Sequence, residues 1–463
     1  MKSVVCDIGM SQNPVQQDLN DPLLDGLYAA NSVEGVKNIP GGSDGAKEVK
    51  LVPLRSAMFN LANTTLGAGI VSIPFFFSQC GIVLGTVLLL IIAQLSAYAS
   101  VLLVEAAQTT NKWSYMEIAE AAFGKRGTRS LEISILGLTV GVLSAFFVQI
   151  GDSGGDAIDS FLPSSENHPW FASHLFVKAA AVCFPLLPLA SLRNLSGMAN
   201  ASLVVIVVIT YLVLIICFMG SGGGGADDDT NDGDDDKDRT DVHWAFIGEN
   251  LFEALPIMVL AFGNQINVHE VVLELQDPSP QRITTLIYGT NLLVSTVYLV
   301  IGIAGYARFG ALTSDNIVLN YHDLHGSQLA AFSVARIGIV VVVMLSYPML
   351  LFPCRHCLHA VLMGALPGHF RAYSADAFFY GETALIIGVT FFVAAVVPVL
   401  GTILGYTGAI AGTLLGFTFP ALYHVALVPA EGRLAPRAMV ALGVAFGVIC
   451  LAAQIAVEAG ASV

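Results

Sequence analysis

Long apolar segments recur along the chain from residue 54 onwards, separated by short polar stretches. A helix needs about 20 predominantly apolar residues to cross the hydrocarbon of a bilayer. Eleven candidate spans lie near residues 54–78, 82–104, 130–151, 173–192, 198–219, 247–269, 283–307, 329–352, 382–399, 402–426 and 437–457. Period-two alternation, which marks the strands of a membrane barrel, does not recur. The pattern predicts an all-α polytopic membrane protein.

Composition supports this class. Of the 463 residues, 55% are hydrophobic and 12% are charged, whereas soluble globular chains carry about 25% charged residues. Much of the net charge of −15 sits in an acidic stretch within residues 220–243, so it gives no reason to expect a nucleic-acid partner. Residues 1–50 are polar and poor in aromatic residues, which predicts a disordered tail.

The distribution of Lys and Arg predicts the orientation in the membrane. If the N-terminus is cytoplasmic, 15 of the 20 Lys and Arg residues fall on the cytoplasmic side and 5 on the other. Cytoplasmic loops carry such an excess of positive charge. The prediction is a cytoplasmic N-terminus and, with an odd number of spans, an extracellular or lumenal C-terminus. A plasma membrane and a vacuolar or lysosomal membrane both fit.

The first span contains residues that a plain membrane anchor does not need. The sequence FNLANTTLGAGIVSIPFFFSQCG (59–81) carries Asn60, Asn63, a Gly-Ala-Gly step at 67–69 and Pro74. Gly and Pro weaken a helix by about 1 and 3 kcal/mol. A broken helix at membrane depth persists only where it is buried in protein or lines a wet cavity, as in transporters. The alternative is that these small residues let two helices pack closely.

The sixth span is interrupted in a similar way. It contains Pro256 and the sequence Ala-Phe-Gly-Asn-Gln at 261–265. An inverted repeat of five spans would place a second broken helix at this position. The half-helix N-termini would then offer a positive dipole end to a substrate carboxylate. Unwound carbonyl groups near Asn60, Asn63 and Thr64 are candidate cation ligands.

An ordered series of further motifs accompanies these two spans. They include SYMEIA at 114–119, FVQIGD at 147–152, NIVLNY at 316–321, SYP at 346–348 and FPAL at 419–422. The series resembles the amino acid/auxin permease family, close to its sodium-coupled neutral amino acid transporter branch. This resemblance implies a LeuT-type fold with a 5+5 inverted repeat and an eleventh transmembrane helix. In these terms a tail at 1–50 precedes a transporter domain at 51–463, with repeats at 54–219 and 247–426, an acidic outer loop at 220–243 and the extra helix at 437–457.

The resemblance also implies a set of site residues. The substrate candidates are Thr64, Thr65, Leu66, Gly67, Ala68 and Gly69 of the first span, Phe262, Gly263 and Asn264 of the sixth, and Gln149 of the third. The candidates for the Na⁺ or H⁺ coupling site are Asn60, Asn63 and Ser346. Related carriers often have a Cys-His pair where this chain has Asn264 and Gln265. Because of this departure, the resemblance does not fix which side chains line the site on the sixth span or which cation is preferred.

Charged residues inside the spans are candidates for gating or proton transfer, because they are costly in hydrocarbon. Glu253 lies in the first turn of the sixth span and is a proton-coupling candidate. Arg336 either snorkels outward or pairs with an acid such as Asp152 as an outer gate. Lys178 is expected to snorkel, and His269 to be solvated at the inner interface.

The function predicted from these features is secondary active transport of small neutral amino acids, coupled to Na⁺ or H⁺ by alternating access. The alternative is an amino-acid-sensing receptor with little flux. The sequence contains no HExxH motif of the zinc metalloproteases, and the chain is not expected to be an enzyme. We expect no cofactor beyond the co-transported cation. The expected partners are the amino acid, the cation and membrane lipid, and the transport unit is expected to be a monomer.

Overall fold

The computed structural model describes residues 51–161, 173–191, 201–218, 242–321, 326–365, 375–429 and 434–460. In these ranges the regular structure is helical, apart from one isolated β-bridge between Val52 and Leu275. The all-α prediction is confirmed for the described residues. The predicted tail at 1–50 and nearly all of the predicted loop at 220–243 lie outside them.

The helices follow the predicted apolar ranges. Those before residue 220 are α2 (Leu54–Thr65), η1 (Ala68–Ser72), α3 (Ile73–Ser78), α4 (Gly81–Thr110), α5 (Tyr115–Phe161), α6 (His174–Ala181), η3 (Val182–Leu186), α7 (Leu187–Ala190) and α8 (Ala201–Phe218). Those after it are α10 (Leu251–Ala261), α11 (Val268–Leu273), α12 (Pro280–Phe309), η5 (Gly310–Leu312), η6 (Ile317–Asn320), α13 (Gly326–Ala365), α14 (Ala375–Val396), α15 (Leu400–Thr407), η8 (Gly408–Gly412), η9 (Leu414–Thr418), α16 (Phe419–Leu427) and α17 (Leu434–Glu458). α5 is kinked at Phe123 and at Gly124, whose φ of 60° favours glycine.

The predicted number of eleven spans is not confirmed. Within the described residues, seven helices are long and apolar enough to cross a membrane, and the bent pair α2 and α3 makes an eighth. The segments expected to span at 173–192, 198–219 and 247–269 form shorter helices, because the chain there is interrupted or leaves the described ranges. The long helices by themselves support the assignment of the chain as a polytopic membrane protein.

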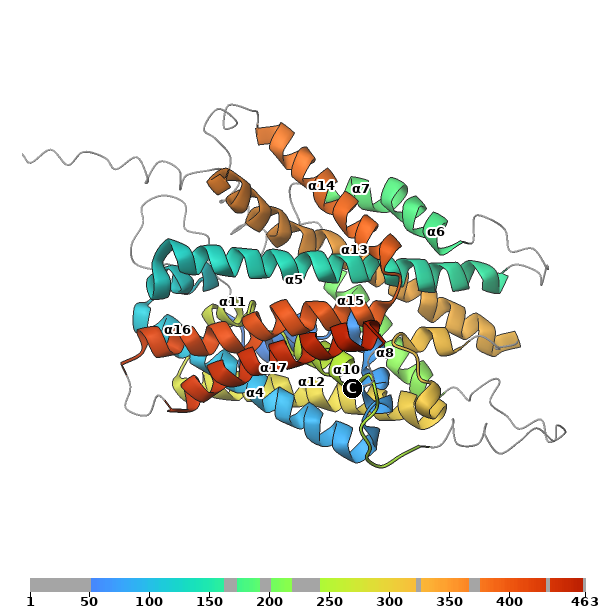
Figure 1. Cartoon of the computed structure of the whole chain (residues 1–463), viewed down its shortest axis with the longest axis horizontal. Helices are drawn as coiled ribbons and strands as arrows, with labels where there is room; N and C mark the ends of the chain where they lie inside the picture. Colours follow the sequence, from blue (N-terminus) through green and yellow to red (C-terminus); the bar gives the residue numbers. More distant parts are fainter. Residues whose placement is uncertain are drawn as a thin grey trace, which may run out of the picture. The chain divides into compact units, whose positions relative to one another are not determined.

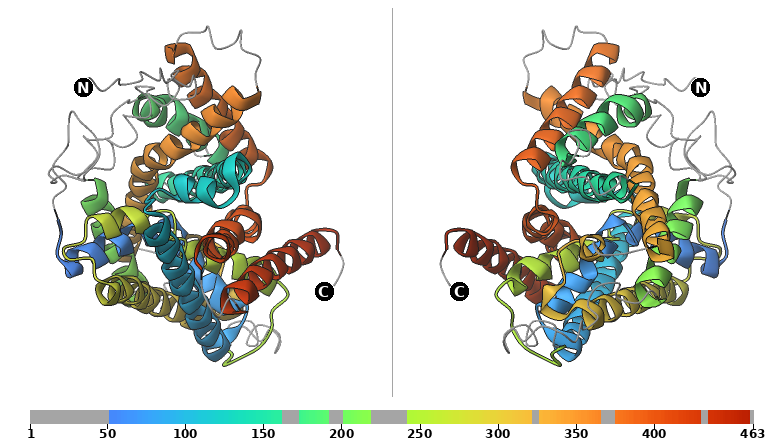
Figure 2. Two further views of the ribbon diagram at one scale, coloured as in Figure 1. Left: turned by 90° about the vertical axis from the view of Figure 1, so that its left-hand side faces the viewer. Right: turned by 90° about the vertical axis from the view of Figure 1, so that its right-hand side faces the viewer.

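The long helices run side by side (Figure 1). α5 packs along α13, while α12 packs against α2, α3 and α4. Figure 2 shows α6 and α14 on one side of α5, with α4, α12 and α17 on the other. Because α5 and α13 contact each other over much of their length, they form a frame against which shorter helices lie.

The two halves of the first span differ in the apolar clusters to which they belong. Ala57 and Leu61 of α2 belong to one buried cluster together with Val271 of α11. Phe76 and Phe77 of α3 belong to another, larger cluster. Ala62 of α2 also belongs to the larger cluster, so α2 contributes to both clusters, whereas the buried apolar residues of η1 and α3 belong to the larger one.

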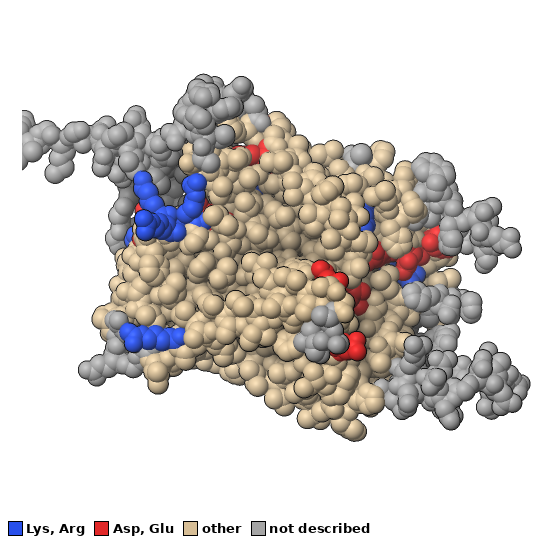
Figure 3. All heavy atoms as spheres, in the orientation of Figure 1, with Lys and Arg blue, Asp and Glu red and all other residues tan. Residues whose placement is uncertain are grey.

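On the face of the molecule that Figure 3 shows, charged side chains are unevenly distributed between the two ends. Figure 3 shows Lys and Arg gathered at one end, where α4 ends and α5 begins, and most Asp and Glu nearer the opposite end. We refer to these as the basic end and the acidic end.

Candidate functional site

The first predicted span is interrupted at Leu66 and Gly67. Leu66 has a ψ of 81°, and Gly67 is extended with φ −98° and ψ −170°. The two half-helices on either side are bent by 67°. A Cβ built on Gly67 or Gly69 would have no described heavy atom within 4 Å, sequence neighbours aside. The distinctive property of these two glycines is therefore open space rather than backbone strain.

An accessible polar stripe on α2 leads to this interruption. Asn60, Asn63 and Thr64 have the spacing i, i+3, i+4, which places them on one face of α2, and Gly67 follows two residues after the helix ends. Asn60, Thr64 and Gly67 are exposed, and Asn63 is half-buried. Hydrocarbon cannot satisfy two side-chain amides, so this face requires water or other polar groups.

The second interruption separates α10 from α11. α10 ends at Ala261, and the chain resumes a helix at Val268. Gly263 is exposed, whereas the Phe262 side chain is fully buried. Its ring packs edge-on against the ring of Tyr298, with 5.3 Å between the centroids. Phe262 therefore anchors this segment, and Gly263 presents backbone to the accessible side.

One hydroxyl group joins the two interruptions. The Tyr298 hydroxyl of α12 lies 3.2 Å from the Thr65 carbonyl oxygen and 2.9 Å from the Ala261 carbonyl oxygen. These are the last residues of α2 and α10. A phenol has one proton, so Tyr298 donates to one of the two carbonyls at a time. The sequence prediction missed Tyr298, although a tyrosine in the middle of an apolar span is a signal, because a buried phenol seeks a partner.

α4 holds the second interruption from another side. The Ser96 hydroxyl donates to the Phe262 carbonyl at 2.8 Å and accepts from Gln265 Nε2 at 2.9 Å. One turn later, the Ser100 hydroxyl donates to Asn264 Oδ1 at 2.9 Å. The side chains of Asn264 and Gln265 are 1% and 2% exposed. Asn264 therefore faces α4 and lies apart from the accessible candidates Thr64, Gly67 and Gly263.

The cation-site candidates lie on two elements. Asn60 and Asn63 belong to α2, and the half-buried Ser346 belongs to α13, which contacts η1. Among the described residues, none of these three side chains hydrogen-bonds a protein group. The same part of the chain holds no cluster of three or more His, Cys, Asp or Glu that could bind a metal ion. The atoms at these positions that could ligate a cation are amide, hydroxyl and carbonyl oxygens.

Residues 53–458 match the family model described as transmembrane amino acid transporter protein. The chain belongs to this family. It is 27% identical over 394 residues to solute carrier family 38 member 10 of Mus musculus, which covers 84% of this chain and 34% of that protein. It is 29% identical over 376 residues to amino acid transporter AVT6A of Arabidopsis thaliana, covering 79% of each chain. The chain thus spans about a third of its mammalian relative's length and most of the plant protein's.

At the acidic end of this transporter-family chain, a buried arginine links three segments. Arg336 of α13 is 3% exposed, and its Nη2 lies 3.3 Å from Asp156 Oδ2 of α5. The same nitrogen donates to the Tyr321 carbonyl at 2.8 Å, and Nη1 donates to the Ser160 hydroxyl at 3.0 Å. One guanidinium therefore ties together α5, α13 and the segment after η6. The acid partner is Asp156, one helical turn beyond the expected Asp152.

Three ionisable side chains lie differently from the sequence-based expectation. Asp152 Oδ1 lies 3.2 Å from His174 Nδ1 rather than against the arginine. Lys178 does not snorkel: it is 3% exposed, and its ammonium donates to the Ala394 carbonyl at 3.2 Å. That carbonyl is in the last turn of α14, where the helix dipole favours a cation. His269 is 1% exposed rather than solvated, because α11 is packed into the protein.

Glu253 and a second acid hold the start of α15. Glu253 Oε1 accepts from the Thr402 hydroxyl at 3.0 Å, and Asp315 Oδ2 accepts from the Gly401 N–H at 2.6 Å. Carboxylates at a helix N-terminus complement its dipole. Glu253 thus has a structural role beside the proton-coupling role predicted for it.

At the basic end, the chain before α2 pairs with the chain after α11. The Val52 N–H donates to the Glu274 carbonyl at 2.8 Å, and the Gln276 N–H donates to the Val52 carbonyl at 3.0 Å. Burial, and then the neighbouring Glu270 carboxylate, raises the pKa of the Glu274 carboxyl above its ordinary value. Half-helices of both interrupted spans are thereby joined at this end.

Proposed function

We propose that the chain is a secondary active carrier that moves a small neutral amino acid across a membrane together with Na⁺ or H⁺. The observation that carries this proposal is the meeting of two interrupted helices at Tyr298, beside the open space at Gly67. Interrupted helices leave peptide N–H and C=O groups free to bind a zwitterion.

The substrate's main-chain groups would bind at the two interruptions. Carbonyl groups at the ends of α2 and α10 suit an ammonium, and N–H groups at the start of η1 suit a carboxylate. The contacts would come from residues 64–69 together with Phe262 and Gly263. Residues 64–69 and 261–267 contain no charged side chain. The pocket therefore offers no counter-charge to an acidic or basic side chain, which favours neutral amino acids.

The coupling cation would bind close to the substrate. Asn60 and Asn63 lie on the accessible stripe that leads to the interruption, and Ser346 on α13 supplies a hydroxyl. Oxygen donors of this kind suit a hard cation such as Na⁺. For H⁺ coupling, Glu253 is the leading candidate, because it is a carboxyl group between α10 and α15.

The difference between the two ends supports alternating access in a LeuT-type arrangement. The basic end is cytoplasmic if the positive-inside rule holds. The polar stripe on α2 is accessible, whereas the Arg336 network closes the acidic end. This combination is what an inward-open state of such a carrier requires.

Uptake into proteoliposomes tests the proposal. The purified chain is reconstituted, and each of the twenty amino acids is offered under an imposed Na⁺ gradient or pH gradient. We expect accumulation of small neutral amino acids, and we expect it to vanish when an ionophore collapses the coupling gradient. Protein-free vesicles are the control. Saturable binding without accumulation would instead favour the receptor, and absence of both would refute the proposal.

A further inference from the structure

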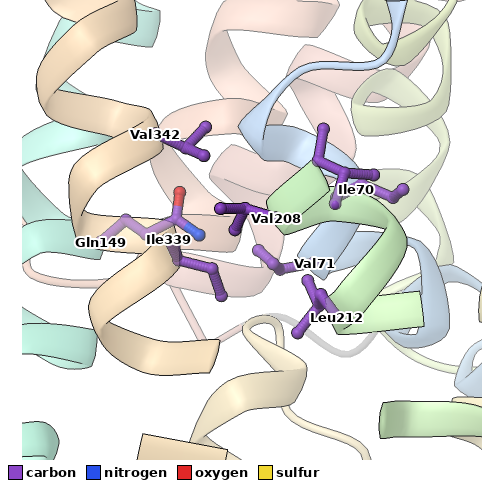
Figure 4. A pocket seen from close by; sticks show the side chains of 8 residues that line it. Ile70, Val71, Gln149, Val208, Leu212, Ile339 and Val342 are labelled. Atoms are coloured by element: carbon purple, nitrogen blue, oxygen red, sulfur yellow. The ribbon is translucent and has the colours of Figure 1, made fainter. Parts of the chain in front are cut away.

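A small apolar cavity adjoins the η1 side of the first interruption (Figure 4). Its walls include Ile70 and Val71 of η1, Gln149 of α5, Val208 of α8, and Ile339 and Val342 of α13. It leaves about 10 Å³ of free space for a water-sized sphere, which is close to the room that one water molecule needs. Of the side chains that line it, only that of Gln149 is polar.

The Gln149 amide has no protein partner for its nitrogen. The side chain is 1% exposed, and Nε2 makes no hydrogen bond to a described residue. Figure 4 shows the amide pointing between the aliphatic side chains toward Val208. Buried amide groups are almost always hydrogen-bonded, so an unpaired one at a cavity indicates a missing partner.

Two further buried hydroxyls in the adjoining segments share this property. Ser72 follows Val71 on η1, and Ser153 lies one helical turn after Gln149 on α5. Both are fully buried, and neither hydroxyl has a partner among the described residues. Unsatisfied polar atoms therefore lie on η1 and on α5, two of the elements that line the cavity.

We propose that this cavity is the side-chain subsite of the carrier, and that Gln149 selects a short hydroxylated side chain over its apolar isostere. This inference rests on the function proposed above. Ile70 directly follows Gly69, and consecutive Cα atoms are about 3.8 Å apart. A substrate held at residues 64–69 would therefore lie next to a residue that lines the cavity, and its side chain would reach the cavity from there.

The size and lining of the cavity define the substrate class. Room for about one water-sized group suits the hydroxyl of serine. The Gln149 Nε2 donates a hydrogen bond to that oxygen, whereas a methyl group in its place leaves the amide unpaired. Sites built to hydrogen-bond a hydroxyl discriminate strongly against the analogue that lacks it. Aliphatic walls without a charged side chain exclude ionised side chains.

Serine and 2-aminobutyrate provide the test, because they differ only by a hydroxyl in place of a methyl group. We expect wild-type protein in proteoliposomes to transport serine with a kcat/KM at least about tenfold above that of 2-aminobutyrate. Gln149→Met should bring the ratio to about one, chiefly by lowering the value for serine. Gln94→Met is the matched control, since Gln94 is an exposed glutamine of α4, and the ratio should stay as in wild type.

A second variant keeps the test open if Gln149→Met does not fold. Val342→Ala enlarges the cavity and should raise transport of threonine relative to serine by about threefold or more. A serine preference that persists in Gln149→Met, or an equal rate for both substrates in wild type, would overturn the inference and leave a structural water as the occupant. Those outcomes leave the carrier intact, whereas absence of any amino-acid uptake refutes the carrier itself.

Discussion

The two halves of the first interrupted span have different surroundings. On α2, Asn60 and Thr64 are exposed along one face. Every residue from 70 to 78, across η1 and α3, is buried. The two halves together are apolar enough to form one bent span, but both amides of that span, Asn60 and Asn63, lie on α2. The interruption is therefore accessible along α2, from the basic end, whereas η1 and α3 are enclosed by other parts of the protein.

The closures at the two ends also differ in kind. At the acidic end, the Arg336 side chain links α5, α13 and the segment after η6. At the basic end, Val52 contributes two backbone hydrogen bonds that join the start of α2 to the chain after α11. The first closure depends on one guanidinium, so substitution can remove it without altering the backbone.

The largest expected effect follows from filling the open space beside the interruption. We expect Gly67→Val to lower amino-acid uptake in proteoliposomes by roughly a hundredfold, because the added atoms occupy the proposed substrate position. The thermal midpoint should stay close to wild type, since the Cβ meets no described neighbour. Gly388→Val on α14 is the matched control, because that glycine also has open space. Normal uptake by Gly67→Val would show that the accessible face is not the substrate path.

The next effect concerns the closure of the acidic end. Arg336→Gln removes the ion pair between Arg336 and Asp156 and should lower the free energy of unfolding by about 2 kcal/mol. This is less than for a fully buried pair, because the Asp156 side chain is 20% exposed. In the same background, a cysteine at Ser72 should become reactive to a membrane-impermeant maleimide added from the acidic side. Arg308→Gln is the control, since Arg308 bonds only the Tyr321 hydroxyl, at 3.3 Å, among the interactions of described residues. An unreactive cysteine would assign the closure to other contacts.

A smaller effect is expected from the hydroxyl that joins both interruptions. Tyr298→Phe removes one hydrogen bond, which should cost about 1 kcal/mol of stability. Uptake should fall by about tenfold, because the ends of α2 and α10 lose their common donor. Tyr211→Phe also loses a bond, to the Ala331 carbonyl at 2.9 Å, but away from the interruptions. If both variants transport equally well, Tyr298 serves packing alone.

The smallest effect is a pH dependence at the basic end. Because the pKa of Glu274 is raised in the folded protein, its neutral form contributes stability that is complete below the ordinary pKa. That contribution is lost as the pH rises through the raised value. We expect Glu274→Gln to raise the thermal midpoint at pH 8 by about 1 °C. The difference from wild type should disappear in acid, and a constant difference across the pH range would contradict this assignment.

The interruptions were predictable from sequence because their signal is local. Glycines and amides weaken an apolar helix at the positions where they occur, and both predicted interruptions are present. Tyr298 and Ser96 were missed, since their roles depend on carbonyl groups of helices distant in the sequence. The sequence also could not predict which way the Asn264 side chain points, because the conformation of an irregular segment depends on the element it packs against. The prediction that Lys178 snorkels was wrong, because its burial against α14 has no signal in the sequence around Lys178.

The β-bridge at Val52 constrains how the basic end would open in the proposed carrier. The start of α2 can swing away only by rupturing both backbone bonds or by carrying α11 with it. Since the second course preserves the bonds, the two half-helices travel as one body. In the proposed carrier, the polar stripe on α2 and the sixth-span wall of the proposed pocket would then move in a single step. In the carrier proposed above, such a gate would have no half-open intermediate through which the cation could pass without the amino acid.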